Sequence, residues 1–165
     1  MATPTTLPAS FVAGDILTAA QMNNLRGAFR ILQVVTATTS TAVSSSVGTF
    51  ADTGLTATIT PTSSSSKVLV FANHPGNQKS AGNVNNCLNL KLFRGATELA
   101  FNNSIGAQNV VAELLFSTSF LHMDSPATTS ATTYKTTFAN FGAAASVTVQ
   151  VVSIPSTIVL MEISA

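Results

Sequence analysis

The chain has 165 residues, enough for one domain with a substantial core, and it is unusually poor in charge. Only 8% of its residues are charged and the net charge is +1, whereas about a quarter of the residues in a typical soluble domain are charged. Without a basic cluster, the sequence has no electrostatic attraction for nucleic acid. Its polar surface must come mainly from serine and threonine, which favours large subunit contacts because little charge has to be desolvated.

The sequence also restricts the cellular compartment. No run of 18 apolar residues is present, so we expect no membrane span. The start MATPTTLPAS lacks a charged n-region and an apolar h-region, so we expect no secretory signal. A single cysteine, Cys87, excludes an internal disulfide. These features fit synthesis in a reducing cytoplasm.

The first part of the chain predicts an extended arm followed by a short helix. Residues 1–14 are rich in proline and small residues. Thr18 and Gln21 then have the spacing of a capping box, and Leu17 and Met22 that of a hydrophobic staple. We expect the helix to run to about Arg30.

This helix is predicted to dock. Met22, Leu25, Phe29 and Leu32 are spaced three, four and three residues apart, which places them in a heptad-like stripe. A helix this short is marginal in water, so the stripe needs a partner surface. The partner is either the chain's own domain, or sister copies or a docking protein. Residues 1–32 are predicted to be an anchoring and trimerisation segment, with Leu17 and the stripe as its contacts.

From residue 33 to 165 the sequence predicts a mainly β domain. Alternating apolar and polar residues, separated by turn clusters, indicate antiparallel strands. The predicted strands are 55–60, 67–73, 87–95, 110–123, 132–141, 146–152 and 156–163. In 87–95, Leu88, Leu90 and Leu92 are expected on one face and Asn89, Lys91 and Phe93 on the other. The pattern predicts an antiparallel, jelly-roll-like β-sandwich behind the arm and helix.

Groups able to carry catalysis are scarce. His74 lies in the predicted turn NHPGN, and His122 near the end of a strand, where it would share a face with Asp124. No feature selects one nucleophile among the many hydroxyl groups. Asp124 is more simply the first residue of a D-S-P turn, bonding nearby amides. We therefore predict no catalytic residues and no enzyme activity.

The remaining polar candidates also favour structural roles. Cys87 is expected to be a small buried residue, and no second cysteine or paired histidine offers a metal-ligand spacing within the chain, so neither metal nor cofactor is predicted. Arg94 is expected to be a solvated charge at a hairpin turn. Glu113 and Glu162 interrupt apolar strands, so each faces water or is paired, within the chain or across a subunit boundary.

Several segments resemble virion proteins of tailed bacteriophages. SFVAGDILTAAQMNNL resembles a segment that precedes fibre or appendage domains. TATITPTSSSSKVLV, LKLFRGATEL, MDSPATTSATTYKTTFA and STIVLMEI resemble, in this order, the C-terminal domain of phage tail-fibre-like proteins. The resemblance covers residues 10–163, and DSPATTSATTYK is its most specific part. Here Asp124 and Pro126 are expected to fix a turn, and Tyr134 and Phe138 to share one face of the following strand.

The resemblance implies a trimeric jelly-roll domain exposed on a virion, with no catalytic motif. It suggests a short homotrimeric tail-fibre-like appendage, attached to baseplate, tail or capsid proteins by its arm and binding a host surface glycan or protein. The chain has no extended shaft between arm and domain, so a capsid decoration or head-fibre protein is the main alternative. A glycan-cleaving appendage is disfavoured because paired carboxylates are scarce. The expected location is the virion surface, after synthesis in the bacterial host cytoplasm.

Overall fold

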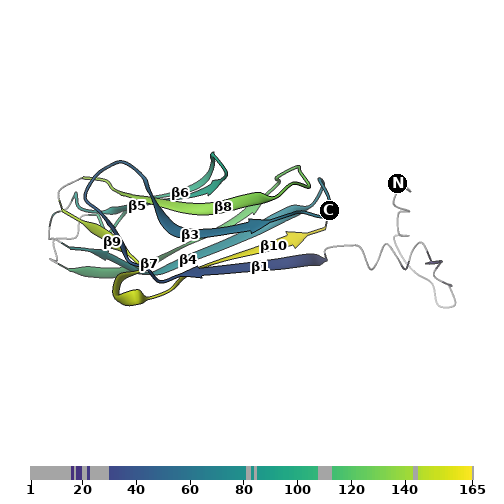
Figure 1. Cartoon of the computed structure of the whole chain (residues 1–165), viewed down its shortest axis with the longest axis horizontal. Coiled ribbons are helices and arrows are strands. Elements are labelled where there is room, and N and C mark those ends of the chain that lie inside the picture. Colours follow the sequence, from purple (N-terminus) through teal and green to yellow (C-terminus); the bar gives the residue numbers. More distant parts are fainter. Residues whose placement is uncertain are drawn as a thin grey trace.

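The computed structural model describes residues 16, 18, 19, 22, 30–80, 83, 85–107, 113–142 and 145–164. From Ile31 to Ile163 these residues form a β-sandwich of a six-stranded and a four-stranded antiparallel sheet (Figure 1). The strands are β1 Ile31–Thr39, β2 Val43–Ser45, β3 Ala51–Ile59, β4 Lys67–Lys79, β5 Leu88–Arg94, β6 Thr97–Ile105, β7 Leu114–Asp124, β8 Thr132–Asn140, β9 Val147–Val149 and β10 Ser156–Ile163, with one 3-10 turn, η1, at Val151–Ser153. The predicted mainly β sandwich is confirmed.

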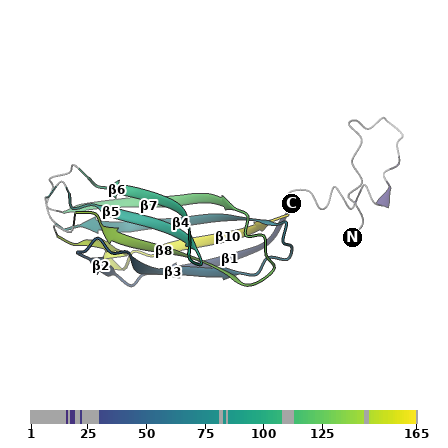
Figure 2. The same ribbon diagram turned by 90° about the horizontal axis from the view of Figure 1, so that it is seen from above.

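The two sheets draw strands from all parts of the chain. The six-stranded sheet has the order β1-β10-β4-β9-β2, and β7 pairs with β4 in addition. The four-stranded sheet has the order β3-β8-β5-β6 and faces the viewer in Figure 2. Neighbouring strands are therefore often distant in sequence, and the position of a residue on the surface depends on pairing rather than on its sequence neighbours.

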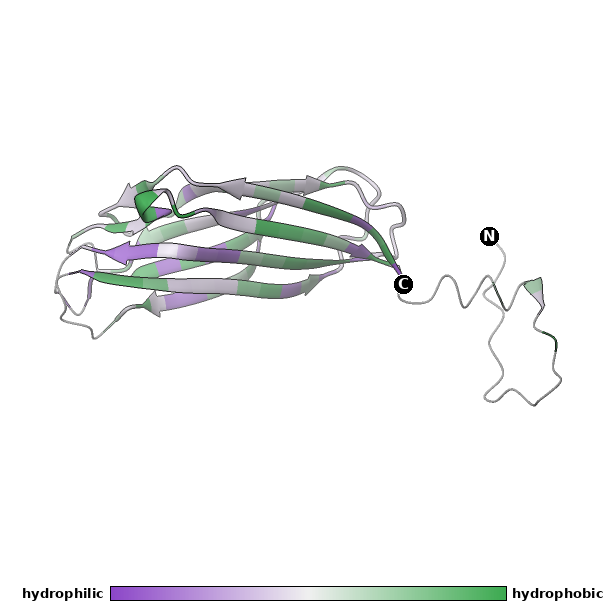
Figure 3. Ribbon diagram, turned by 90° about the horizontal axis from the view of Figure 1, so that it is seen from below, coloured by the Kyte–Doolittle hydropathy of each residue, from purple (hydrophilic) through white to green (hydrophobic). Residues whose placement is uncertain are grey.

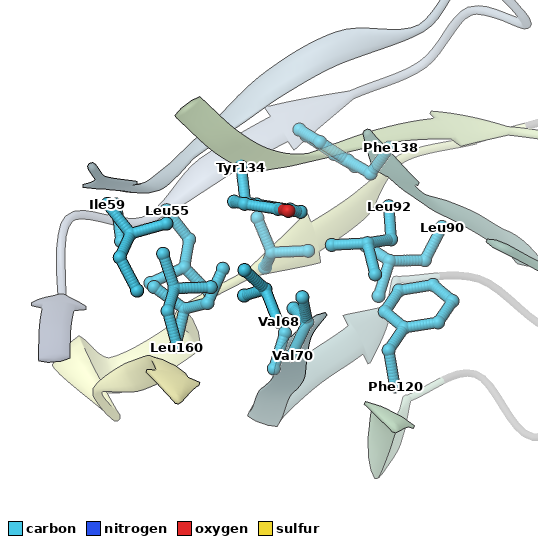
Figure 4. Close-up of a cluster of buried hydrophobic side chains, with 14 of the residues drawn as sticks. Leu55, Ile59, Val68, Val70, Leu90, Leu92, Phe120, Tyr134, Phe138 and Leu160 are labelled. Carbon is cyan, nitrogen blue, oxygen red and sulfur yellow. The ribbon is translucent and has the colours of Figure 1, made fainter. Parts of the chain in front are cut away.

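The core lies between the sheets and follows the period-two pattern of the strands (Figure 4). The buried apolar residues are Leu55, Ala57, Ile59, Val68, Val70, Ala72, Leu88, Leu90, Leu92, Phe120, Tyr134, Phe138, Val147, Val149, Ile158 and Leu160. The prediction that Leu88, Leu90 and Leu92 share a face is confirmed, and so is the prediction for Tyr134 and Phe138. The serine run 63–66 lies in the loop between β3 and β4.

The predicted turn NHPGN (73–77) is wrong, because β4 continues through it to Lys79. The pairing of β4 with β7 shifts register between His74 and Asn77. This irregularity accommodates the proline and glycine between them without ending the strand. Gly76 is required there, since a Cβ atom at this position would lie 2.8 Å from Cβ of Ile154.

Other strand boundaries also differ from the prediction, because the pattern of apolar and polar side chains does not show where the backbone turns. The strand predicted over 146–152 ends at Val149, since Gln150 has a φ of 55° and begins the turn of η1. Strand β6 was not predicted separately, because its polar sequence FNNS hides the alternation. The predicted hairpin turn is confirmed: Gly95 lies between β5 and β6, and its N–H donates to Thr133 O at 2.8 Å.

Both ends of the sandwich chain meet at one end of the molecule (Figure 1). The N–H of Ser164 donates to Arg30 O at 2.9 Å, and the N–H of Arg30 donates to Ser164 Oγ at 3.0 Å. Arg30, directly before β1, therefore lies beside the end of the C-terminal strand. We refer to this end as the arm end.

Candidate interaction surface

The outer face of the six-stranded sheet carries an apolar surface that spans four strands. Antiparallel pairing aligns one row of side chains from β1, β10, β4 and β7: Val34, Met161, Leu69 and Met123. The adjacent row on the same strands is Thr36, Val159, Phe71 and Leu121. We call the seven apolar residues of these rows the apolar face. The eighth residue of the two rows is Thr36, so no charged side chain interrupts them.

Much of the apolar face is open to solvent. Leu121 is 73% exposed, Val34 54%, Met123 47% and Phe71 40%. Figure 3 views the molecule from this side and shows apolar segments on neighbouring strands. Contiguous exposed apolar patches of this kind are uncommon in monomeric proteins and mark interaction sites. The surface is therefore the strongest candidate for a functional contact in the part of the chain that the structure describes.

The outer face of the four-stranded sheet has the opposite character. Its rows across β3, β8, β5 and β6 are Asp52, Thr137, Lys91 and Phe101, and next to them Thr56, Lys135, Phe93 and Glu98. The charges are paired at the surface: Lys135 Nζ lies 2.7 Å from Asp52 Oδ1, and Lys91 Nζ 2.7 Å from Glu98 Oε2. This face is suited to water, whereas the apolar face is not.

A buried carboxylate fixes the edge strand of the apolar face. Glu162 accepts hydrogen bonds from Gln33 Nε2 at 2.6 Å and from Thr62 N and Oγ1, each at 2.7 Å. Burial alone would raise the pKa of Glu162, but these hydrogen bonds outweigh it and lower the pKa to about 2. The carboxylate is thus paired within the chain, while Glu113 is exposed and accepts from Gln78 Nε2 at 3.2 Å.

The predicted docking residues are only partly visible. Leu17, Leu25 and Phe29 lie outside the described residues. Met22 is helical and 52% exposed, and its N–H donates to Thr18 O at 3.0 Å, which agrees with a helix beginning near Thr18. Leu32 does not continue the helical stripe, because β1 begins at Ile31. It lies on the strand instead and shares the outer side of β1 with Val34.

The sequence did contain a signal for the apolar face. A strand with one solvated face alternates, whereas a strand covered on both faces is apolar at successive positions. The runs VLVF (68–71) and IVLM (158–161) are continuous in this sense. These runs indicate that both faces of β4 and β10 are buried, and a buried outer face was not among the predictions.

Asp124 belongs to a cluster with Arg94 and Tyr134. Its carboxylate oxygens lie 2.7 and 2.8 Å from Arg94 Nη1, and the Tyr134 hydroxyl donates to Oδ2 at 2.6 Å. Burial and the hydrogen bond to Asp124 raise the pKa of Tyr134. The predictions that Asp124 bonds nearby amides and that Arg94 is a solvated turn charge are therefore wrong. His122 shares the inward side of β7 with Asp124, but the carboxylate binds Arg94 and Tyr134 instead.

His74 is buried between the sheets rather than exposed in a turn. Its Nε2 lies 3.0 Å from Thr136 Oγ1 on the four-stranded sheet, and its Nδ1 lies 2.9 Å from Ser156 Oγ on its own sheet. Burial lowers the pKa of His74 to about 4. The neutral ring is therefore a polar bridge across the core, and the turn prediction missed it because its partners are distant in sequence.

The other candidates are placed as follows. Cys87 is 1% exposed directly before β5, as predicted for a small buried residue, and burial raises the pKa of its thiol. Among the described residues, no three His, Cys, Asp or Glu side chains gather as a metal site would require. No helix within the described ranges has the length and apolar character needed to cross a membrane.

Comparison with known proteins gives little further information. No family model matches the sequence, and no curated protein matches it. Among solved structures, VP2 of the infectious bursal disease virus subviral particle is similar, with a TM-score of 0.49 and 12% sequence identity over 80% of this chain and 32% of that chain. The chain thus spans about a third of the length of that protein. A similarity at this level transfers neither an activity nor a partner.

Proposed function

We propose that this chain is a non-enzymatic structural protein of a bacteriophage virion that assembles as a homotrimer through its apolar face. The observation that carries the proposal is the contrast between the outer faces of the two sheets. One has seven aligned apolar residues, and the other has paired charges and threonines beside Phe93 and Phe101. Covering apolar surface stabilises an assembly by about 25 cal/mol per Å². Packing the apolar faces together leaves the polar faces outward.

A copy of the same chain suits the apolar face better than a charged partner does. The register gives a partner no ionic contact within the two rows. The chain has a net charge of +1 and 8% charged residues, so copies repel one another weakly. Homo-oligomers with closed symmetry are also the commonest soluble assemblies.

A threefold axis parallel to the strands would also place the three attachment segments together. Arg30 and Ser164 are joined at the arm end. In a trimer whose axis runs along the sandwich, all three arms leave from this end. They would attach to one platform of baseplate, tail or capsid proteins. The resemblance of residues 10–25 to segments that precede phage appendage domains supports this role.

Two placements on the virion surface follow, both after synthesis in the bacterial host cytoplasm. In the first, the trimer is a short tail-fibre-like appendage whose exposed sandwich binds the host surface. In the second, it is a capsid decoration or head-fibre protein. The second is favoured by one feature: β1 begins at Ile31, so within this sequence no shaft separates the attachment segment from the sandwich.

Removing residues 1–29 is expected to abolish incorporation into virions while leaving the sandwich folded. The deletion retains β1 and both hydrogen bonds between Arg30 and Ser164. Circular dichroism should show an unchanged β-rich spectrum, and immunoblots of purified particles should show no truncated protein.

Gold-labelled antibody against the chain, applied to wild-type particles, separates the placements because it labels either the tail or the capsid. Normal incorporation of the truncated protein would show that the anchor lies elsewhere. Particles that carry no antibody label at all would contradict a virion role.

A further inference from the structure

A hollow of about 540 Å³ opens on the outer face of the four-stranded sheet. Phe50 and Phe93 contribute its aromatic lining, and Asp52, Lys135 and Thr137 its polar groups. A second hollow of about 140 Å³ is also lined by Asp52 and Lys135, so the two adjoin at this ion pair. Sites for small ligands typically have about 300–1,000 Å³, apolar walls and a few convergent polar groups. The larger hollow has both the size and the composition of such a site.

A bulge in β3 lines the smaller hollow. Asp52 pairs with Thr137 and Thr56 with Lys135, so three residues of β3 oppose the single residue Thr136 of β8. Thr53 Oγ1, inside the sandwich, lies 2.6 Å from Thr136 Oγ1 and fixes the bulge from within. Gly54, which lines the smaller hollow, has a φ of 84°, a backbone conformation that favours glycine. The distortion therefore has a consequence at the surface: it leaves space beside Asp52 and Lys135.

The polar groups form a neutral pair that solvent can reach. Asp52 Oδ1 and Lys135 Nζ are 2.7 Å apart, and their side chains are 62% and 37% exposed. The pair offers both a hydrogen-bond acceptor and a donor, without net charge. An anionic ligand would meet Asp52, and a cationic ligand would meet Lys135. A neutral polar ligand is the class that this arrangement accepts.

We propose that this hollow binds a neutral saccharide of a surface glycan. A sugar ring has an apolar C–H face, which suits Phe93, and hydroxyl edges, which suit Asp52 and Lys135. Phe50 adds apolar lining, while Lys91 Nζ lies over its ring, 4.4 Å from the centroid. The Thr56 hydroxyl, which lines the smaller hollow and donates to Tyr134 O at 3.2 Å, adds a hydrogen-bond acceptor beside the ion pair. This inference rests on the proposed function in one respect: it requires the four-stranded sheet to face outward.

The test uses the full-length protein with a glycan array of neutral oligosaccharides built from glucose, galactose and N-acetylhexosamines. Sulfated and sialylated oligosaccharides are included on the same array. At least one neutral series should bind, and titration calorimetry with that free oligosaccharide should give its Kd. Asp52→Asn and Phe93→Ala should each weaken binding at least tenfold. Glu98→Gln makes the same carboxylate-to-amide change on this sheet outside the hollow, and should leave the Kd within about twofold of wild type.

The outcomes decide between this inference and the proposed function. Thermal melting establishes that each variant is folded, and Asp52→Asn, at an exposed site, keeps the test valid if Phe93→Ala is unstable. Absence of binding to every neutral oligosaccharide, equal binding by wild type and Asp52→Asn, or binding only to anionic glycans would each overturn the saccharide site. Trimer mass and virion incorporation are measured separately, so a failed saccharide site leaves the assembly proposal standing. A monomer that binds the neutral glycan would contradict the assembly and retain the site.

Discussion

Leu121→Asp is expected to convert the assembled protein into a folded monomer. Leu121 is 73% exposed, so its replacement removes little packing within the chain. In the proposed trimer the same position lies next to Phe71, within the covered apolar face. An aspartate there would be buried without a partner, which costs about 3 kcal/mol or more and weakens association by roughly 100-fold or more. The effect should therefore be on assembly rather than on folding.

Light scattering at matched concentrations measures the change, and circular dichroism confirms that the variant is folded. Thr58→Asp is the matched control, because it places the same carboxylate on an exposed strand position of the opposite sheet. Thr58→Asp should leave the mass of the assembly unchanged. It removes only one surface hydrogen bond, between Thr58 and Thr133. If Leu121→Asp keeps the mass of wild type, the apolar face is not the contact between copies.

Acid is expected to destabilise the sandwich in a range set by His74. The pKa of this buried ring is lowered from 6.5 to about 4. Between pH 6.5 and about 4, His74 is protonated in the unfolded chain but neutral in the folded chain. The free energy of unfolding therefore falls as the pH falls through this range. The total loss is roughly 3 kcal/mol. Below pH 4.5 a further loss begins, because the pKa of Glu162 is about 2 in the folded chain and the unfolded carboxyl is protonated first.

Denaturant unfolding between pH 7.5 and 4.5, at one fixed protein concentration, isolates the contribution of His74. His74→Gln should flatten the pH dependence in this range, whatever its effect on stability at pH 7.5. His122→Gln replaces the chain's other histidine and should retain the dependence. A wild-type free energy of unfolding that stays constant from pH 7.5 to 4.5 would show that the ring takes up its proton without opening the core.

The sequence predicted the strands best where one face is buried. In β5, the alternation of Leu88, Leu90 and Leu92 with polar residues gave both the strand and its inward side. The outer surface was harder, because β1, β10, β4 and β7 are separated by long stretches of chain. Only their register brings Val34 beside Met161 and Phe71 beside Leu121. The continuous apolar runs indicated that two strands have covered outer faces, but not that these faces are adjacent.

Buried polar residues were missed for a related reason. His74 followed by proline and glycine has the local chemistry of a turn, and Asp124 before Ser-Pro has the same. In the folded chain both are held by partners far away in sequence: Thr136 and Ser156 for His74, and Arg94 for Asp124. Local propensity predicts the commonest use of such residues. It carries no information about a partner supplied by the opposite sheet.

We propose that the apolar face is buried between copies of this chain. Sedimentation equilibrium of the wild-type protein at micromolar concentrations tests it most directly. We predict a single species of three times the 17.0 kDa chain mass. A single species of 17.0 kDa across this concentration range would show that the chain does not assemble through its apolar face.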